Sequence, residues 1–458
     1  MDVETLARIQ FAVTIMFHYI YPPLSIGLGL ILIIIESIYL KTKDPHYLSM
    51  AKFWTKVFAL TFALGVATGI VMEFEFGTNW ATYSRFVGDV FGSALAAEGV
   101  FAFFLESGFL AILLFGWDRV GPKVHYLATW MVSLGAHFSA IWIIVANSWM
   151  QTPTGFHIVG EGLKARAEIT DFWAMVFNPS SMDRLMHSVI GAWLAGAFLV
   201  ISVGAYYILK GKYLRFAKSS LKIGLIVAII ACVLQGFSGD SSAKVVAKYQ
   251  PMKLAAMEAI YKTQEGAPLT IYGIVNPKEQ RLDYAVGIPK LLSYLSYGSF
   301  SAEVKGLDQF PQKDWPKVAV VFQTYHIMIM MWGCMLGISL LAAFLWYRGT
   351  LFHNKWVLRA LVASVLFPQV ANQAGWVTAE MGRYPWIVYG LLRISDGLSK
   401  VVTANQVLGS LIMFSILYFL LFLVFIYLLN EKFKHGPDDT IGTTHYRQLD
   451  TSIKEIKK

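Results

Sequence analysis

The sequence has little charge and almost no cysteine. Of its 458 residues, 15% are Asp, Glu, Lys or Arg and 56% are hydrophobic, whereas roughly 25% of a soluble domain is charged. Several apolar runs also exceed the roughly 20 residues that cross a bilayer. These properties exclude a soluble protein and indicate a polytopic membrane protein. The two cysteines, Cys232 and Cys334, lie in apolar runs, which predicts buried hydrophobic side chains and no disulfide.

The net charge of +9 does not indicate a nucleic-acid partner. Lys and Arg lie in short stretches between the apolar runs, which is the pattern of membrane orientation and differs from that of a basic groove. The amino terminus, MDVETLAR, is acidic, and the first apolar run is too long for a cleaved signal peptide. We therefore expect this run to remain as a helix.

The apolar runs predict an all-α polytopic membrane protein with about nine transmembrane helices. The predicted spans are residues 8–38, 54–74, 95–116, 124–147, 186–209, 220–239, 319–347, 358–380 and 404–430. The eighth span is the weakest because polar residues and a proline interrupt it, namely Pro368, Gln369, Asn372 and Gln373.

The loop charges predict the orientation of the chain. The short turns after the first, third, fifth and seventh spans carry several Lys and Arg each, whereas the short turn after the second span carries only Arg85. Positive loops face the cytoplasm. The N-terminus is then outside and the C-terminus in the cytoplasm. This pattern divides the chain into a six-helix part, a long outside loop, a three-helix part and a cytoplasmic tail, at residues 1–239, 240–318, 319–430 and 431–458.

Ionisable groups inside the predicted spans are the first candidates for a site, because such groups are energetically expensive in a bilayer. With the predicted orientation, nearly all of them fall in the outer half of the membrane, which scattered structural groups would not favour. They are His18, Glu73, Glu98, Glu106, His187, His326 and Glu380, with the polar residues Ser139 and Asn147 nearby.

The residues alone leave several interpretations open. A lone membrane histidine is more often hydrogen-bonded to a neighbouring helix than bound to a metal, and methionines such as Met328 usually serve packing. Glu98 and Glu106 are separated by about 80° of rotation and about 12 Å of rise, so they line one proton path or have separate partners. Imidazole and thioether groups are haem ligands, and carboxylates carry protons. The pattern therefore indicates an outer-leaflet redox or ion site.

Several stretches resemble subunit I of the cytochrome bd quinol oxidases, over essentially the whole chain. They are RIQFAVTIMFHYIYPPLSIG, MEFEFGTNW, GSALAAEGVFAFFLES, WIIVANSWMQTP, KLAAMEA and GWVTAEMGRYPW. The resemblance implies a multi-pass protein of the bacterial cytoplasmic (inner) membrane. It implies that quinol is oxidised at the outer face and oxygen is reduced to water with cytoplasmic protons, which generates a proton-motive force without pumping. The loop at 240–318 lacks a C-terminal insertion and is similar to the short quinol-loop type.

The resemblance also implies cofactors and partners. The family carries two haem b groups and one haem d, or a third haem b, and uses quinol as substrate. The implied partners are subunit II, the lipid bilayer, quinol and oxygen, with no nucleic acid. The resemblance leaves open whether a small single-helix accessory subunit is also present.

By resemblance, the haem ligands are His187 and Met328 for the low-spin haem b, and His18 and Glu380 for the two other haems. Arg8 and Arg383 match arginines that contact propionates, and Trp376 matches an aromatic residue among the haems. Lys253 and Glu258 match the quinol-binding pair of the loop. Glu98 and Glu106 match carboxylates beside the oxygen-reducing site, where they relay protons or supply an additional haem ligand. The predicted proton path comprises Glu73, Glu98, Glu106, Ser139 and Asn147.

The sequence departs from the family pattern at two positions. His326 stands where some members have an arginine two residues before the ligand methionine. Side chains two apart on a helix point roughly 200° from each other, so His326 and Met328 do not both face one iron. We favour Met328 as ligand, which leaves His326 as a propionate contact or as the alternative ligand. Tyr384 stands in place of the glutamine of the motif often written GRQPW.

The residues alone are also compatible with two other functions. An ion-coupled transporter would use Glu73, Glu98 and Glu106 and would need no haem. A cytochrome b of the bc type, serving electron transfer, would place two histidines about a dozen residues apart on each of two helices. His125 and His137 have this spacing, but the sequence has no second such pair.

Overall fold

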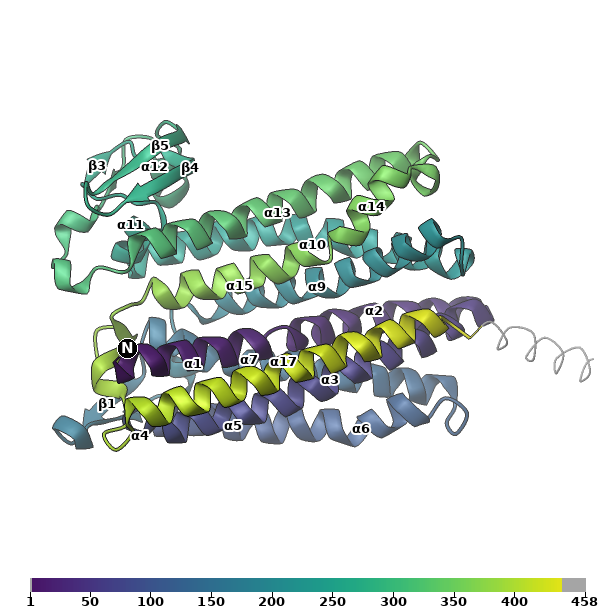
Figure 1. Ribbon diagram of the computed structural model, residues 1–458, viewed down its shortest axis with the longest axis horizontal. Helices are drawn as coiled ribbons and strands as arrows, with labels where there is room; N and C mark the ends of the chain where they lie inside the picture. Colours follow the sequence, from purple (N-terminus) through teal and green to yellow (C-terminus); the bar gives the residue numbers. More distant parts are fainter. Residues whose placement is uncertain (1, 439–458) are drawn as a thin grey trace, which may run out of the picture.

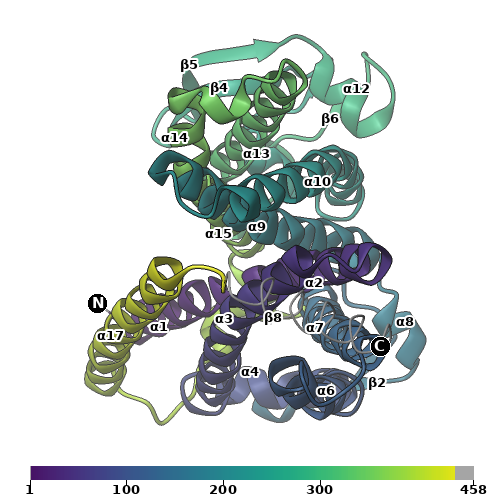
Figure 2. The ribbon, with the colours of Figure 1, turned by 90° about the vertical axis from the view of Figure 1, so that its right-hand side faces the viewer.

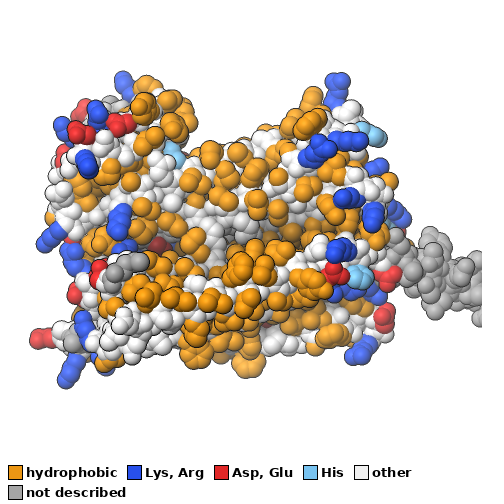
Figure 3. Space-filling model, viewed as in Figure 1, with side chains coloured by type: hydrophobic (Ala, Val, Ile, Leu, Met, Phe, Trp, Pro, Cys, Tyr) orange, Lys and Arg blue, Asp and Glu red, His pale blue; other side chains and the backbone are white. Residues whose placement is uncertain are grey.

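The computed structural model describes residues 2–438. Within this range, eight helical segments are long and apolar enough to cross a membrane. They lie side by side in one elongated bundle (Figure 1). Hydrophobic side chains cover the middle of the viewed face, and charged side chains gather towards its two ends (Figure 3). The predicted fold class, a helical polytopic membrane protein, is confirmed.

The long helices include every predicted span except the eighth. Their bounds are α1 (Val3–His18), α2 (Tyr21–Thr42), α3 (Pro45–Thr78), α5 (Gly88–Glu98), α6 (Phe104–Phe115), α7 (Pro122–Gln151), α9 (Ser181–Lys210), α10 (Leu214–Tyr249), α13 (Val318–Tyr347) and α17 (Ala404–His435). A π-helical turn, η1 (Gly99–Phe103), joins α5 to α6. Several helices extend beyond the predicted spans because hydropathy marks only their apolar part.

The predicted eighth span consists of two shorter helices, α14 (Lys355–Ala363) and α15 (Leu366–Met381). Neither helix is among those long enough to cross a membrane alone. Pro368 lies in the first turn of α15, where a missing N–H is tolerated. The first span is also broken, because α1 ends at His18 and α2 starts at Tyr21, immediately before Pro22 and Pro23. The break between α1 and α2 directly follows His18. The break between α14 and α15 lies at the start of the helix that carries Glu380.

The loop between α10 and α13 forms a small subdomain at one end of the bundle, which we call the loop end. Two antiparallel strand pairs, β4–β5 and β3–β6, pack on two short helices. The elements are α11 (Pro251–Met257), β3 (Gln264–Glu265), β4 (Leu269–Asn276), β5 (Arg281–Ile288), α12 (Leu291–Tyr297), β6 (Glu303–Val304), η3 (Leu307–Gln309) and η4 (Gln312–Asp314). The N-terminus also lies at the loop end (Figure 1).

Two further hairpins, three short α-helices and one 3₁₀-helix cover the remaining connections at the loop end. They are α4 (Ala81–Phe86), β1 (Phe156–Val159), η2 (Gly162–Lys164), β2 (Arg166–Ile169), α8 (Phe172–Val176), β7 (Trp386–Val388), β8 (Leu392–Arg393) and α16 (Ile394–Gly397). The sequence analysis did not predict these short strands, because each is too short to show an alternating pattern.

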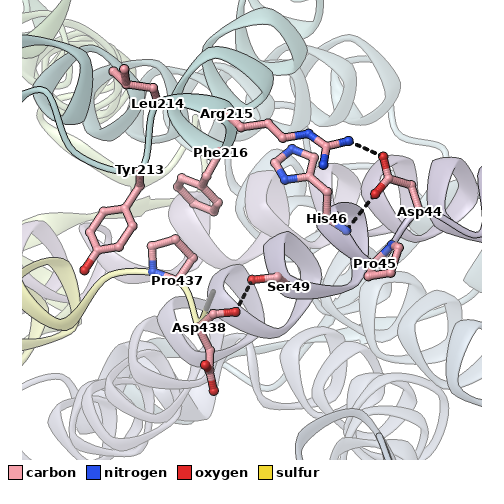
Figure 4. A pocket seen from close by; sticks show the side chains of 10 residues that line it. All are labelled: Asp44, Pro45, His46, Ser49, Tyr213, Leu214, Arg215, Phe216, Pro437 and Asp438. Carbon is pink, nitrogen blue, oxygen red and sulfur yellow. Dashed lines mark hydrogen bonds and ion pairs between the residues drawn. The ribbon is translucent and has the colours of Figure 1, made fainter. Parts of the chain in front are cut away.

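The opposite end of the bundle, which we call the basic end, carries the Lys- and Arg-rich turns, including η5 (Leu351–His353). A pocket of about 570 Å³ opens there between the α2–α3 turn, the α9–α10 turn and the chain after α17 (Figure 4). Arg215 contacts Asp44 at 2.5 Å, and the Ser49 hydroxyl donates to the Asp438 carbonyl at 3.0 Å. The predicted site residues lie elsewhere, so this pocket has no part in the site.

The outer helices expose apolar side chains as expected for a membrane protein. On α17 these include Phe419, Leu420 and Tyr427, and on α13 they include Phe344. Cys232 is buried as predicted, but Cys334 is exposed on α13. The prediction of burial for Cys334 was wrong because an apolar run in a membrane helix can face lipid as readily as protein.

Glycines allow a close contact between two helices of the bundle. Figure 2 shows α9, α10, α13, α14 and α15 on one side and α1, α2, α3, α6, α7 and α17 on the other. The two groups meet where α2 contacts α9. A Cβ added at Gly27 would overlap the carbonyl oxygen of Ala192, and a Cβ at Gly196 would overlap the backbone of Gly27. Small residues allow this backbone-to-backbone packing in membranes.

We expect Gly27→Ala to destabilise the purified protein by about 1–3 kcal/mol, because the added methyl group must separate α2 from α9. The matched control is Gly337→Ala on α13, where no described heavy atom lies within 4 Å of the added Cβ. Melting temperatures in detergent would compare the two variants. Equal stability of both would contradict the assigned helix contact.

Candidate functional site

His18 is the last residue of α1 and presents one free ring nitrogen. Its Nδ1 lies 2.9 Å from the Thr68 hydroxyl of α3, and that hydroxyl donates to the Leu64 carbonyl at 2.7 Å. Because the hydroxyl has a single proton, it accepts from Nδ1–H, which leaves the Nε2 lone pair available. A Cβ at Gly69 would lie only 3.3 Å from the His18 ring. The imidazole therefore has the tautomer and second partner typical of a metal ligand.

His187 on α9 has a similar arrangement. Its Nδ1 lies 3.0 Å from the Ser238 hydroxyl of α10, which itself donates to the Gln235 carbonyl at 3.1 Å. The Nδ1–H is thus the donor to Ser238. The Gln235 amide nitrogen lies 3.1 Å from both ring nitrogens. The Nε2 lone pair therefore faces the Gln235 amide nitrogen.

Met328 and His326 point to different surroundings, as their helical spacing predicts. A Cβ at Gly375 of α15 would lie 2.9 Å from the Met328 sulfur, so glycine provides the space for the thioether. His326 instead directs Nδ1 to the Phe322 carbonyl at 2.8 Å and Nε2 to the Thr270 carbonyl of β4 at 3.0 Å. Both nitrogens of His326 are engaged by backbone, so it lacks a nitrogen for iron or for a propionate.

Glu380 lies near the end of α15 between two donors. The Asn147 amide of α7 donates to Oε1 at 3.1 Å, and the Arg383 guanidinium contacts Oε2. Helix α15 ends at Met381, so Arg383 reaches Glu380 from the turn after the helix. The Glu380 side chain remains 33% exposed while Arg383 is 5% exposed. The carboxylate therefore borders an open space with lone pairs to spare.

Arg184 is a member of this cluster that the sequence analysis missed. Its guanidinium donates to Asn147 Oδ1 at 2.5 Å and to the Ser148 hydroxyl at 3.2 Å. It also lies 5.8 Å from the centre of the Trp376 ring. Arg184 precedes His187 by three residues and so shares its helix face. This spacing from His187 is the feature of the sequence that could have identified Arg184.

Arg8 and Trp376, which were predicted to contact the haems or their propionates, lie close to this cluster, and so does Tyr384. Arg8 stacks over the Tyr384 ring at 4.5 Å and donates to the Met381 sulfur at 3.6 Å. The Trp376 ring packs edge-on against Tyr19, with centroids 5.3 Å apart. Tyr384, which departs from the family motif, therefore provides an aromatic face for Arg8.

Glu98 and Glu106 both face α7. The Ser139 hydroxyl donates to Glu98 at 2.5 Å, and Gly135, one turn earlier, leaves room for the Glu106 side chain. The π-helical turn η1 separates the two carboxylates and absorbs the rotation that an ideal α-helix would impose. Of the two alternatives from spacing, the structure brings both residues to one helix face.

Glu73 and Glu75 of α3 differ in burial. Glu73, predicted to lie on the proton path, is exposed. Glu75 is 2% exposed and accepts from the Thr14 hydroxyl of α1 at 2.6 Å. The Thr14 hydroxyl accepts from Tyr418 of α17 at 3.1 Å. The sequence analysis did not single out Glu75, although residues two apart on a helix face opposite sides.

Lys253 and Glu258 belong to α11 and its C-terminal cap, at the loop end. Lys253 is buried and donates to Gln151 at 2.9 Å. Burial, helped by the guanidinium of Arg184, lowers the pKa of Lys253 well below its usual range. Glu258 is 1% exposed, and its Oε2 accepts from the Thr270 N–H at 3.4 Å. Burial raises the pKa of the Glu258 carboxyl to about 8.

The two regions are joined at Gly382. A Cβ at this position would lie 2.8 Å from Cγ and Cε of Lys253. The side chain of Lys253 therefore packs on the turn between Glu380 and Arg383. Gln151 extends the link, because its amide donates to the Ala379 carbonyl at 3.3 Å. Lys253 of the loop is therefore in direct contact with the turn that follows Glu380.

The comparisons with known proteins agree with this arrangement. The family model of cytochrome bd terminal oxidase subunit I matches residues 6–437. The chain belongs to this family. It is 40% identical to cytochrome bd ubiquinol oxidase subunit 1 of Bacillus subtilis (strain 168), over 94% of each chain. The cytochrome bd-II ubiquinol oxidase subunit 1 of Escherichia coli (strain K12) is 35% identical, over 95% of this chain and 97% of the relative.

A solved structure shares the fold. The structure of the bd oxidase from Geobacillus thermodenitrificans superposes with a TM-score of 0.87 and 30% identity, and it covers 95% of this chain and 99% of that one. The bc-type alternative fails on geometry as well. His125 contacts Glu36 and the Leu113 carbonyl, and His137 contacts the Ser133 carbonyl and Trp193. All four ring nitrogens of this histidine pair are engaged.

Membership of the cytochrome bd family implies haem, and the residues present fit that group. His18 has a free ring nitrogen, the Met328 sulfur sits over a glycine, and Glu380 borders open space. Buried polar atoms without a hydrogen-bond partner among residues 2–438 include Arg383 Nη1, Gln235 Oε1 and Gln373 Oε1. An unpaired buried guanidinium nitrogen suits an anionic group such as a haem propionate.

We expect Arg184→Leu to destabilise the protein by about 1–3 kcal/mol, because it leaves Asn147 and Ser148 without their donor. The control is Arg166→Leu, which removes an exposed ion pair with Glu168 on the β1–β2 hairpin and should cost less than about 1 kcal/mol. Thermal melting of the purified complex would check this. A smaller loss for Arg184→Leu than for Arg166→Leu would contradict the structural role of Arg184.

Proposed function

We propose that this chain is the haem-binding subunit of a quinol:oxygen oxidoreductase, in which it pairs with a subunit II in a bacterial cytoplasmic membrane. The family match over residues 6–437 carries this proposal. One relative is named a ubiquinol oxidase and another a putative menaquinol oxidase, so the chemistry assigned here is oxidation of a quinol without a choice of quinone. The contact between Lys253 of the loop and the turn that follows Glu380 supports it.

The ligand assignment follows the family resemblance, and the surroundings of the donor atoms support it. We assign His187 and Met328 to a low-spin haem b, and His18 and Glu380 to the two other haems, of which one is haem d or a third haem b. The engagement of both His326 nitrogens by backbone carbonyls supports Met328 over His326. When bound, the haems accept electrons from quinol and pass them to oxygen.

Quinol oxidation is assigned to the buried pair at the loop end. Each quinol releases two electrons and two protons, so two quinols supply the four electrons that reduce one oxygen molecule to two waters. Glu258 has one carboxylate oxygen without a partner among the described residues, which suits it to accept a quinol hydroxyl proton. Lys253 is a buried amine 2.9 Å from Gln151, positioned to bind a quinol oxygen.

Proton delivery to the oxygen-reducing site is assigned to Glu106, Glu98 and Ser139. The loop charges support a cytoplasmic basic end and an outer loop end. Quinol protons then leave outside, while the four protons for water come from the cytoplasm. This arrangement separates charge without a pump. Asn147 holds Glu380 in this scheme, and the exposed Glu73 lies off the buried part of the path.

We expect Met328→Leu to abolish the low-spin haem signal in a reduced-minus-oxidised spectrum and to leave the signals of the other haems. The thioether is the ligand in this assignment, and leucine keeps the volume without the sulfur. His326→Gln is the matched variant two residues away and should retain the low-spin signal. If His326→Gln loses the low-spin haem and Met328→Leu keeps it, the assignment is wrong.

We expect the rate of quinol oxidation to rise with pH and to level off above about 8. The carboxylate of Glu258 is the proton-accepting form, and burial raises its pKa to about 8, so the active form grows as pH increases through that value. Glu258→Gln should remove this pH dependence and lower kcat by about 10²-fold or more.

Steady-state oxygen consumption with excess quinol, measured over a pH series, tests this role. The control is Glu279→Gln, an exposed carboxylate in the turn between β4 and β5 of the same loop. The control should keep the parental rate and pH profile. A parental pH profile in Glu258→Gln would remove Glu258 from the reaction.

A further inference from the structure

A buried carboxylate–imidazole pair lies in the basic half of the bundle, outside the site described above. Glu36 of α2 and His125 of α7 are each 3% exposed, and Thr129 of α7 is 1% exposed. His125 Nδ1 lies 3.1 Å from Glu36 Oε2, and the Thr129 hydroxyl donates to Glu36 Oε1 at 2.6 Å. Each carboxylate oxygen thus has a polar partner on α7.

We infer that Glu36, His125 and Thr129 form a proton-loading station that takes up protons from the basic end and passes them along α7 to Glu106. This inference rests on the proposed function, because it supplies the protons that oxygen reduction consumes. Nothing in the chemistry assigned above uses these three residues. Ionisable side chains inside membrane helices are costly and commonly mark proton relays.

The station is close to the surface of the basic end. His125 lies in the first turn of α7, which starts at Pro122. The Trp117 ring covers its imidazole, with centroids 3.6 Å apart. Lys52 lies 5.8 Å from the Trp117 ring and pairs with Asp118, whose side chain is 90% exposed. One indole therefore separates the buried imidazole from charged surface groups.

A polar track on α7 runs from the station to the predicted oxygen-reducing end. Thr129 and Ser133 follow His125 at one-turn intervals, so all three lie on one face of the helix. Ser133 is buried and lies against Gly29 of α2, where an added Cβ would be 2.8 Å from its hydroxyl oxygen. Gly135 then accommodates Glu106. Ten residues of helix, about 15 Å, separate His125 from Gly135.

The intervals along this track are suited to transfer through hydroxyls and bridging water. One helical turn rises about 5.4 Å, which exceeds a direct hydrogen bond but fits one water between two polar groups. Helix α7 contacts both α2 and α6. Ser133 faces α2 and Gly135, two residues later, faces α6, so the last step of the track passes around α7 to reach Glu106.

The proton step balances without any electron transfer. A proton taken up at the station converts the Glu36 carboxylate to the acid, while His125 keeps the proton that it shares with the Leu113 carbonyl, 3.1 Å from Nε2. Transfer through the Thr129 hydroxyl to the track restores the carboxylate. The proton ends in water at the oxygen-reducing site, and electrons come only from quinol.

The test is proton uptake by the purified holo-complex during a single turnover with oxygen, followed with a pH-sensitive dye. Glu36→Gln and Thr129→Val should each slow the uptake at least tenfold, and Glu36→Asp should restore most of the rate. The matched control is Ser37→Ala, which removes a hydroxyl next to Glu36 that contacts Tyr126 at 2.7 Å instead of the track. The control should keep the parental rate.

The outcomes distinguish a failure of this inference from a failure of the proposed function. Anaerobic reduction of the haems by quinol should be unchanged in all four variants, because the station lies away from the loop end. Parental uptake rates in Glu36→Gln and Thr129→Val would overturn the inference while leaving the oxidase intact. If Glu36→Gln fails to assemble, a parental rate in Thr129→Val alone would overturn it. A parental complex that does not reduce oxygen would instead refute the proposed function.

Discussion

The structure depends on the cost of placing polar and ionisable side chains inside an apolar bundle. Several of these groups have a partner on another helix, as when Thr68 receives the Nδ1 proton of His18 and Asn147 holds Glu380. These bonds fix the side chains in single orientations. Arg383 Nη1 and Glu258 Oε1 are among the buried atoms that lack partners within residues 2–438, and in the proposed function a cofactor or substrate supplies the missing contact.

The sequence predicted the bundle because hydropathy alone identifies long apolar helices. Glu380 and Lys253 were singled out because they stand in family motifs, and the structure brings Lys253 against the turn that follows Glu380. Their roles stay predictions. The sequence did not predict that α14 and α15 replace a single span, although the polar residues and Pro368 marked that span as the weakest. It also did not predict that the π-helical turn brings Glu98 and Glu106 to one helix face, because this turn has no pattern in the residues.

The residues that sequence analysis missed share one property: their significance depends on partners far away in the chain. Arg184 matters because Asn147 lies opposite, and Glu75 because Thr14 does. His125 was considered only as one half of a haem-ligating pair, a role that its contact with Glu36 rules out. A single sequence does not show which charged residues face each other across a membrane bundle, whereas the three-dimensional arrangement does.

The measurement that tests the central claim most directly is haem extraction combined with a reduced-minus-oxidised spectrum of the purified parental complex. The account predicts haem b bands together with a third haem signal, and reduction of the haems on addition of quinol under anaerobic conditions. An intact, folded complex that contains no haem, or whose haems quinol does not reduce, would contradict the oxidase assignment and return the intramembrane carboxylates to an ion-transport interpretation.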